Sequence, residues 1–185
     1  DAYLVAFPTP EGDEKPAGRL ASLSGNGGKI GQQTIADGDW TSIYQVKKGN
    51  DGAKGFVQFS FMEPFTARAM TIVPAVKGAS MSGVLQFSND GKNFKNISRF
   101  SVGRWRSLEG LTCISFEPVK ADYFRVVFDQ EAVIREIELT ASPRIHNYPE
   151  KSGFKSTANP EMHFNRNISD KFIINPEEIV NLSSL

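Results

Sequence analysis

The feature that most constrains the fold of this chain is a predicted β-hairpin in residues 83–100. Residues 84–87 are rich in β-branched and aromatic side chains, as strands are. Asn, Asp and Gly at positions 89–91 follow, and these residue types accept the positive φ angles that tight turns require. Phe94 and Ile97 then begin a return strand. The sequence therefore predicts two antiparallel strands joined by a short turn.

Further short apolar segments recur along the chain without a helical period of ten residues or more. Predicted strands cover residues 3–7, 56–61, 67–73, 107–116, 123–128 and 133–139. Pro64 is expected to separate the second of these from the third, and residues 8–33, rich in Gly and Pro, are expected to be loops. About eight strands at this spacing predict an all-β fold, an antiparallel jelly-roll β-sandwich.

Alternation predicts which strand residues face the core. Phe124, Val126 and Phe128 share one face of their strand, as apolar residues at every second position do. In the last strand, Val133, Ile137 and Leu139 alternate with Ile134, Glu136 and Glu138.

Charge and cysteine content exclude several classes of function. Lys and Arg total 21 and Asp and Glu also total 21, so there is no basic excess for a nucleic acid or an anionic membrane. No apolar run approaches the length of a membrane span. Cys113 is the single cysteine, which excludes an intramolecular disulfide, and its apolar strand predicts a buried thiol.

The chain is predicted to divide into a β-sandwich at residues 1–141 and an irregular tail at residues 142–185. Residues that interrupt regular secondary structure recur in the tail, at Pro143, Pro149, Gly153, Pro160 and Pro176. Its apolar side chains, including Ile145 and Ile173, are too many for a free linker. We therefore expect the tail to pack along the sandwich and to lead toward a parent domain of a longer protein.

The order of the segments resembles that of the galactose-binding-like β-sandwiches, which include discoidin domains and many carbohydrate-binding modules. The resemblance covers residues 34–139 and is carried by ADGDWTS at 36–42, LQFSNDGKNF at 85–94, PVKADYFRVVF at 118–128 and IREIEL at 134–139. The opening loop is shorter than in the family, and its tryptophan falls earlier. The resemblance implies a galactose-binding-like jelly roll.

A second resemblance concerns the ends of the chain. AYLVAFPTPEG at 2–12, RIHNYPEKSGF at 144–154 and INPEEIVNLSS at 174–184 resemble segments of family 106 glycoside hydrolases, the α-L-rhamnosidase type. This implies an accessory domain of a large secreted or periplasmic enzyme that degrades plant or other polysaccharide.

The sequence predicts that the chain is not an enzyme by itself. A glycosidase needs two carboxylates on opposite sides of a sugar. Glu136 and Glu138 lie two positions apart on one strand and hence on the same face, where we expect them to be solvated. His146 and His163 lack the spacing of a metal or nucleophile site.

The galactose-binding-like resemblance implies a structural Ca²⁺ between the opening loop and the last strand. The matching positions are Asp37, Thr41 and Glu136. Calcium takes six to eight oxygens, partly from backbone carbonyls. The alternative is an N-cap or turn role for Asp37 and Thr41 and a solvated Glu136.

Sugar binding requires an aromatic face for the ring and polar groups for the hydroxyls. Trp105 beside Arg104 lies between strands, and Trp40 lies in the opening loop. The alternatives for Trp105 are a cation–π surface feature and an interdomain contact. The alternative for Trp40 is a position in the core, which is the expected one. The predicted function is an accessory carbohydrate-contacting or buttressing domain, with an independent carbohydrate-binding module or a structural or adhesion domain as alternatives.

Overall fold

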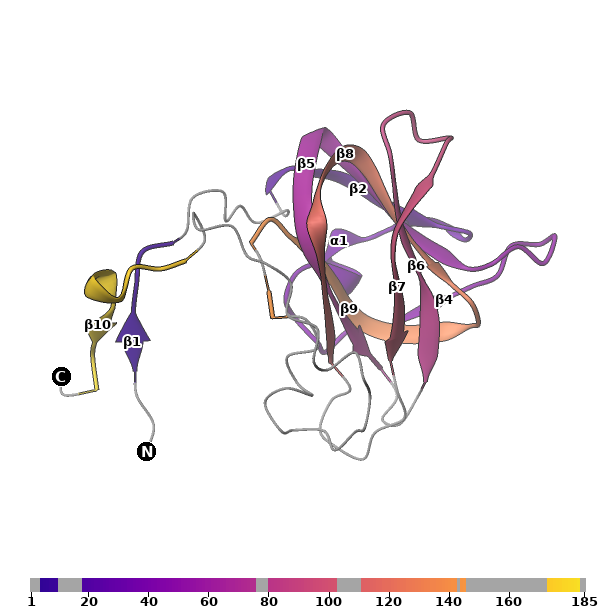
Figure 1. The fold of residues 1–185 in the computed structure, drawn as a ribbon. Helices are drawn as coiled ribbons and strands as arrows, with labels where there is room; N and C mark the ends of the chain where they lie inside the picture. The colour runs from indigo at the N-terminus through magenta and orange to yellow at the C-terminus, as the bar shows by residue number, and fades with distance from the viewer. Residues whose placement is uncertain are drawn as a thin grey trace.

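The computed structural model describes residues 4–9, 18–75, 80–102, 111–142, 144–145 and 173–183 (Figure 1). The elements of the main body are β2 (Leu20–Gly25), β3 (Gly28–Ile30), α1 (Gln32–Ile35), β4 (Tyr44–Val46), β5 (Phe56–Pro74), β6 (Met81–Ser88), β7 (Lys95–Val102), β8 (Thr112–Phe128) and β9 (Ala132–Thr140). Near the chain ends lie β1 (Val5–Ala6), the short 3-10 helix η4 (Pro176–Glu178) and β10 (Val180–Asn181). The all-β prediction is confirmed.

The main body is one hydrogen-bonded sheet that folds over on itself into two layers. The first half of β5 lies between β2 and the second half of β8, in a layer with the order β3-β2-β5-β8-β6-β7. We call this the six-stranded layer. The second half of β5 lies between the first half of β8 and β9, and β9 also pairs with β4. All of these pairings are antiparallel, which confirms the β-sandwich.

The long strands β5 and β8 belong to both layers because each bends at an exposed proline. The pairing of β5 with β8 shifts register between Ser60 and Phe65, and again between Ala67 and Ala69. Pro64 and Pro118 fall in these gaps of the register, where a residue without an N–H interrupts no ladder bond. The expectation that Pro64 separates two strands was therefore wrong: it marks a bend within one strand.

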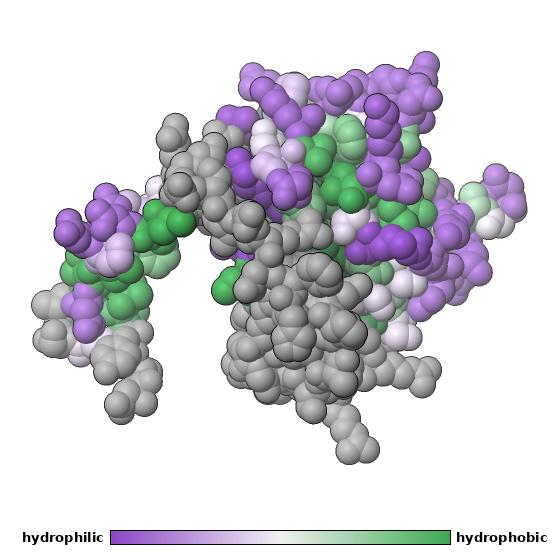
Figure 2. Space-filling view, in the orientation of Figure 1, coloured by the Kyte–Doolittle hydropathy of each residue, from purple (hydrophilic) through white to green (hydrophobic). Residues whose placement is uncertain are grey.

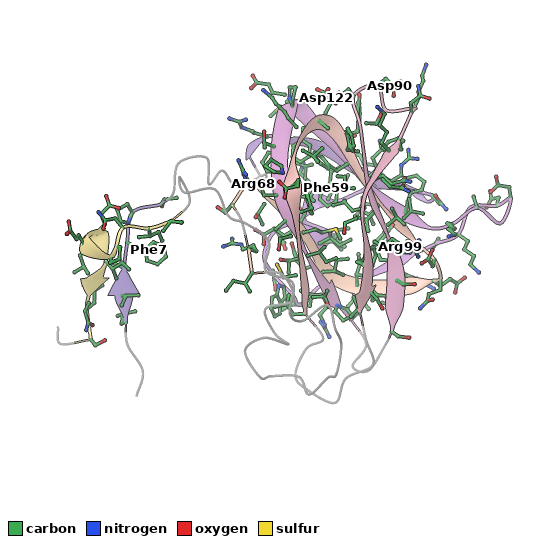
Figure 3. The ribbon with its side chains drawn as sticks, viewed as in Figure 1. Phe7, Phe59, Arg68, Asp90, Arg99 and Asp122 are labelled. Carbon is green, nitrogen blue, oxygen red and sulfur yellow. The ribbon has the colours of Figure 1, made fainter. Side chains whose placement is uncertain are left out.

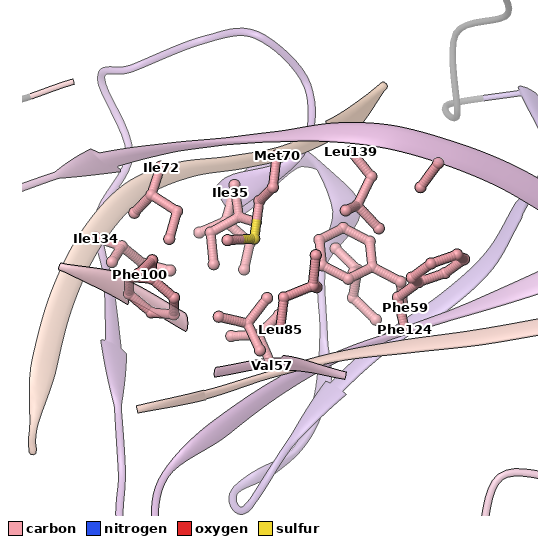
Figure 4. Packing of buried hydrophobic residues seen from close by; sticks show 14 of the residues in the cluster. Ile35, Val57, Phe59, Met70, Ile72, Leu85, Phe100, Phe124, Ile134 and Leu139 are labelled. Atoms are coloured by element: carbon pink, nitrogen blue, oxygen red, sulfur yellow. The ribbon is translucent and has the colours of Figure 1, made fainter. Parts of the chain in front are cut away.

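Phenylalanine and aliphatic side chains from both layers fill the space between them (Figure 4). Phe124, Val126 and Phe128 all point into this core and are fully buried, as their alternation predicts. Phe61 stacks on Phe65 across the bend of β5, with ring centroids 4.7 Å apart. The aromatic rings thus extend the hydrophobic core to the bend that connects the two layers.

The predicted hairpin is β6 and β7, which pair from Met81 with Val102 to Phe87 with Lys95. Asp90 holds the turn. Its carboxylate accepts backbone N–H bonds from Lys92 and Asn93, each 2.8 Å long. These bonds hold the pKa of the Asp90 carboxyl well below its ordinary value, the bonds from Asn93 contributing most. Within the turn, Gly91 adopts the left-handed region with φ of 69°.

A second hairpin, β2 and β3, lies where the sequence predicted loops. Leu23 of β2 is fully buried and pairs with Ile30 of β3. The turn contains Asn26 and Gly27, a residue pair typical of two-residue hairpins. That signal could have identified the hairpin, but the glycine-rich composition of the segment obscured it.

The two ends of the chain meet in a small ribbon of β1 and β10. Val5 pairs with Asn181 and Ala6 with Val180, and the Leu182 N–H donates to the Leu4 carbonyl at 2.7 Å. The predicted first strand therefore pairs with the tail rather than with the sandwich. Figure 3 shows Phe7 on this ribbon, apart from Phe59 in the sandwich.

Only part of the predicted packing of the tail falls on described residues. Ile145 is 60% exposed and Ile173 is 62% exposed, so the expectation that these two side chains pack along the sandwich was wrong. Pro143 and residues 146–172 of the tail, with both histidines, lie outside the described residues. Cys113 is buried, as predicted.

The alternation predicted for β9 is interrupted. Ile134 and Ile137 are both fully buried in the core, although they lie an odd number of positions apart. The register with β5 shifts between Val73, which pairs with Glu136, and Pro74, which pairs with Ile134. A bulge of this kind adds one residue and exchanges the faces of a strand.

Candidate functional site

The opening loop at residues 36–43 is stabilised by its own aspartates. Asp37 Oδ1 accepts the N–H of Asp39 at 2.9 Å. Asp39 in turn accepts the N–H and the hydroxyl of Thr41, both at 2.9 Å. The backbone bond from Thr41 is the main reason that the pKa of Asp39 is lowered. Gly38 supplies the positive φ, 81°, that this turn needs.

Glu136 on β9 lies beneath this loop. It is 3% exposed, and the backbone N–H groups of Gly38 and Asp37 lie near enough to its carboxylate to favour the charged form in part. Burial is the main reason that its pKa is raised to about 7, and the negative charges of Asp37 and Glu138 add to the effect. The expectation of a solvated Glu136 was wrong, because the opening loop covers this position.

Three of the side chains here carry oxygens of the kind that a hard cation takes as ligands. Glu136 Oε2 is buried and has no hydrogen-bond partner. Asp37 is close enough for its charge to act on Glu136, and one of its oxygens is bonded within the loop. The Thr41 hydroxyl gives its proton to Asp39, which leaves its lone pairs available.

Carboxylates alone do not make this site. Among the described residues, no three Asp, Glu, His or Cys side chains form a group that could hold a metal. A calcium ion would therefore need the hydroxyl and backbone carbonyls of the loop, which are ordinary Ca²⁺ ligands. The structure brings Asp37 and Glu136 together, while Thr41 is joined to them through Asp39.

Trp40 is directed outward from the same loop. It is 37% exposed, and its carbonyl accepts a 2.7 Å bond from Arg135 of β9. The expectation of a core position was wrong, because the aspartate turns and Arg135 hold the loop against β9 with the indole on the outside. Ile43, 59% exposed, ends the loop.

The other predicted sugar contacts, Arg104 and Trp105, lie outside the described residues. The strand ends that flank them in the sequence are described: Val102 pairs with Met81, and Thr112 pairs with Ile72.

Sequence reasoning missed a second polar site, on the outer face of the six-stranded layer. Arg125 of β8 lies 3.7 Å from the ring centroid of Phe94 and 4.6 Å from that of Phe56. Its Nε and Nη2 donate to Gln58 Oε1 at 3.0 and 2.6 Å. Partial burial lowers the pKa of the guanidinium. Alternation within residues 123–128 already places Arg125 opposite the core-facing Phe124.

Neither site is arranged as a glycosidase active site. The acid of a glycosidase must touch the glycosidic oxygen. Glu136 has a raised pKa but is covered by the opening loop, so a sugar cannot reach it in this conformation. Within the described ranges, no helix is long and apolar enough to cross a membrane.

Sequence comparisons find neither a matching protein-family model nor a matching curated protein. Comparison of structures finds the same fold in carbohydrate-binding modules. The family 32 modules 1 and 2 of Clostridium perfringens ZmpB match with a TM-score of 0.57 and 14% identity, over 75% of this chain and 40% of theirs. A pectin-binding module matches with a TM-score of 0.52 and 19% identity, over 65% of this chain and 90% of its own. The fold is that of a galactose-binding-like β-sandwich.

A more extensive likeness is to one particular enzyme. A rhamnosidase from Novosphingobium sp. PP1Y matches 99% of this chain with a TM-score of 0.74 and 24% identity. The match spans only 17% of the rhamnosidase chain. This chain is therefore similar to one part of a much longer protein.

Proposed function

We propose that this chain is a non-catalytic accessory domain of a polysaccharide-degrading glycoside hydrolase of the α-L-rhamnosidase type, and that it binds carbohydrate. The observation that carries the proposal is the likeness over 99% of the chain to 17% of a rhamnosidase. The fold that it shares with carbohydrate-binding modules supports the binding role. An enzyme of this kind acts on polysaccharide outside the cytoplasm, in the periplasm or after secretion.

We place one sugar contact at the opening loop. Trp40 offers a half-exposed indole on a loop that Arg135 and Glu136 hold in place, which suits stacking on the C–H face of a sugar. Arg104 and Trp105 remain predicted partners. We further propose that Asp37, Thr41 and Glu136 hold a structural Ca²⁺, which would neutralise the buried carboxylate and keep the loop closed.

Buttressing of a catalytic domain is the second role, and the ribbon of β1 and β10 favours it. Its large apolar side chains are exposed: Leu4 63%, Val5 45%, Phe7 50%, Ile179 42% and Val180 56%. Figure 2 shows this apolar surface in green. Two strands of two residues each do not form a stable sheet in water by themselves. A neighbouring domain that covers the ribbon would bury these side chains.

A glycan array with the isolated chain tests the binding role. Binding of one glycan class by the wild type and its loss in Trp40→Ala are expected. Phe7→Ala on the ribbon is the matched control, since it also removes an exposed aromatic ring. A chain that binds no glycan would favour the structural or adhesion alternative.

A further inference from the structure

The six-stranded layer carries a straight row of polar side chains across its outer face, one from each strand. Neighbouring members are direct register partners in every case. From β3 to β7 the row consists of Lys29, Ser24, Gln58, Arg125, Gln86 and Asn96. With strands about 4.8 Å apart, six strands give a row about 24 Å long.

The row is cationic and contains no carboxylate. Lys29 and Arg125 carry its charges, and its other members are uncharged amides and a serine. No Asp or Glu stands at the remaining outward positions of these strands in the described residues, but Asp129, directly after β8, accepts bonds from the outward Ser82 and Arg99 at one end of this face. The outward positions other than the row are Ser22, Phe56, Ser60, Ser82, Val84, Ser88, Arg99, Ser101, Tyr123 and Val127.

Arg125 is a partly buried cation without a counter-ion in the described part of the chain. The ion pairs found there join Lys54 and Arg99 to Asp129, and none includes Arg125. Figure 3 marks Arg99 on β7. A desolvated charge is costly unless it is paired. Two ring faces and an amide oxygen compensate Arg125 in part, and its Nη1 is not used in the bonds to Gln58.

A second row, directly beside the first, is apolar. Phe56, Val127 and Val84 are register partners on β5, β8 and β6, and all three are half-buried. Each lies two positions from a member of the polar row, which is about 7 Å along the strand. A sugar chain presents hydroxyls or carboxylates at its edge and C–H groups on its face, so the paired rows complement it.

Two amide side chains of the polar row are hydrogen-bonded to each other but keep donors and acceptors free for a ligand. Gln86 Nε2 donates to Asn96 Oδ1 at 2.9 Å, which leaves Gln86 Oε1 and the Asn96 NH₂ group for a ligand. A side chain fixed by such a bond loses less rotamer entropy when it binds.

We propose that this outer face is a binding site for an extended acidic glycan, with Arg125 and Lys29 as the partners of uronate carboxylates. The sugar chain lies along the polar row, across the strands, with its C–H faces on the Phe56 row. The inference rests on the proposed carbohydrate-binding function and specifies its ligand class, and it adds a site on the sheet to the contact proposed at the opening loop.

Binding of polygalacturonate to the full chain, measured by calorimetry at low and at moderate salt, tests the proposal. We expect binding that weakens with salt and is lost when the carboxylates are methyl-esterified. Arg125→Gln is expected to reduce the affinity about tenfold, the value of one charge-assisted hydrogen bond. Lys29→Gln, at a more exposed position, is expected to reduce it about threefold.

Two further variants keep the test decisive if Arg125→Gln unfolds the chain. Asn96→Ala removes an exposed member of the row and is expected to reduce affinity. Lys48→Gln removes an equal charge from an exposed position between β4 and β5, outside the six-stranded layer, and is expected to have no effect.

The proposal is overturned if polygalacturonate binds equally well to the row variants, or if its methyl ester or single-stranded DNA binds with similar affinity. Glycan binding that is lost in Trp40→Ala but unchanged in the row variants would overturn this inference and leave the proposed function intact. The absence of binding to every glycan would overturn both.

Discussion

The backbone N–H of Gly38 lies close enough to the carboxylate of Glu136 to favour its charged form, although the two residues are far apart in the sequence. The opening loop covers β9 at this point, and the glutamate is buried. Oε2 of the same carboxylate has no hydrogen-bond partner. The first two predictions follow from this arrangement.

Calcium is expected to stabilise the folded chain. A ligand that binds only the folded state at a hundredfold excess over its Kd adds about 2.7 kcal/mol to the free energy of unfolding. Melting temperatures measured in millimolar calcium and in chelator test this. Glu136→Gln is expected to remove the calcium response, whereas Glu138→Gln is expected to retain most of it. An identical melting temperature in calcium and chelator would contradict the site.

In chelator, the ionisation of Glu136 is expected to lower the free energy of unfolding as the pH rises. Its pKa of about 7 in the folded chain lies above the ordinary 4.5, so the folded chain binds more protons between these values. The free energy of unfolding therefore falls through this window by about 3 kcal/mol for this group.

The difference between wild type and Glu136→Gln isolates this effect. The two proteins are expected to be equally stable near pH 4, and the variant more stable at pH 8. Denaturant unfolding at the two pH values measures this. Parallel stability curves for the two proteins would argue against a buried, titrating carboxyl.

Gly83→Ala is expected to destabilise the sandwich. An added Cβ would overlap the Val127 carbonyl oxygen and lie 2.7 Å from Cζ of Phe100. Overpacking of this kind costs about 1–3 kcal/mol. Gly27→Ala is the control, since its Cβ would have no atom within 4 Å. Equal midpoints of urea unfolding for both variants would show that β6 approaches β8 less closely than the structure indicates.

Asp90→Asn is expected to lower the melting temperature. The neutral amide presents one acceptor oxygen in place of the two carboxylate oxygens that bond Lys92, Asn93 and the Ser88 hydroxyl. Because the folded pKa of Asp90 is lowered, its contribution in the wild type is present at neutral pH and is lost on acidification. Asp122→Asn on β8 controls for a change of charge nearby. If the variant has the same melting temperature as the wild type, the turn does not need the carboxylate.

The isolated chain is expected to hydrolyse no glycoside. Glu136 is buried beneath the loop, and Glu138 lies on the same strand. Release of aryl groups from a panel of aryl glycosides measures this, with heat-denatured protein as the blank. Hydrolysis that disappears on mutation of a single Asp or Glu of the chain would refute the prediction.

The sequence by itself determined the local structure of this protein. Alternation in β8 placed Phe124, Val126 and Phe128 in the core, and the turn residues around Asp90 identified the hairpin of β6 and β7. These features depend on neighbours within a few residues, through φ preferences and the two-residue period of a strand.

Only the tertiary structure decided the environment of Glu136, the outward position of Trp40 and the pairing of β1 with β10. It also decided the row through Gln58 and Arg125, which exists because five strand pairings are each in one particular register. Register between distant strands is set by the bends and bulges of the whole sheet and by what must be buried between its layers. A pattern within one strand does not contain that information.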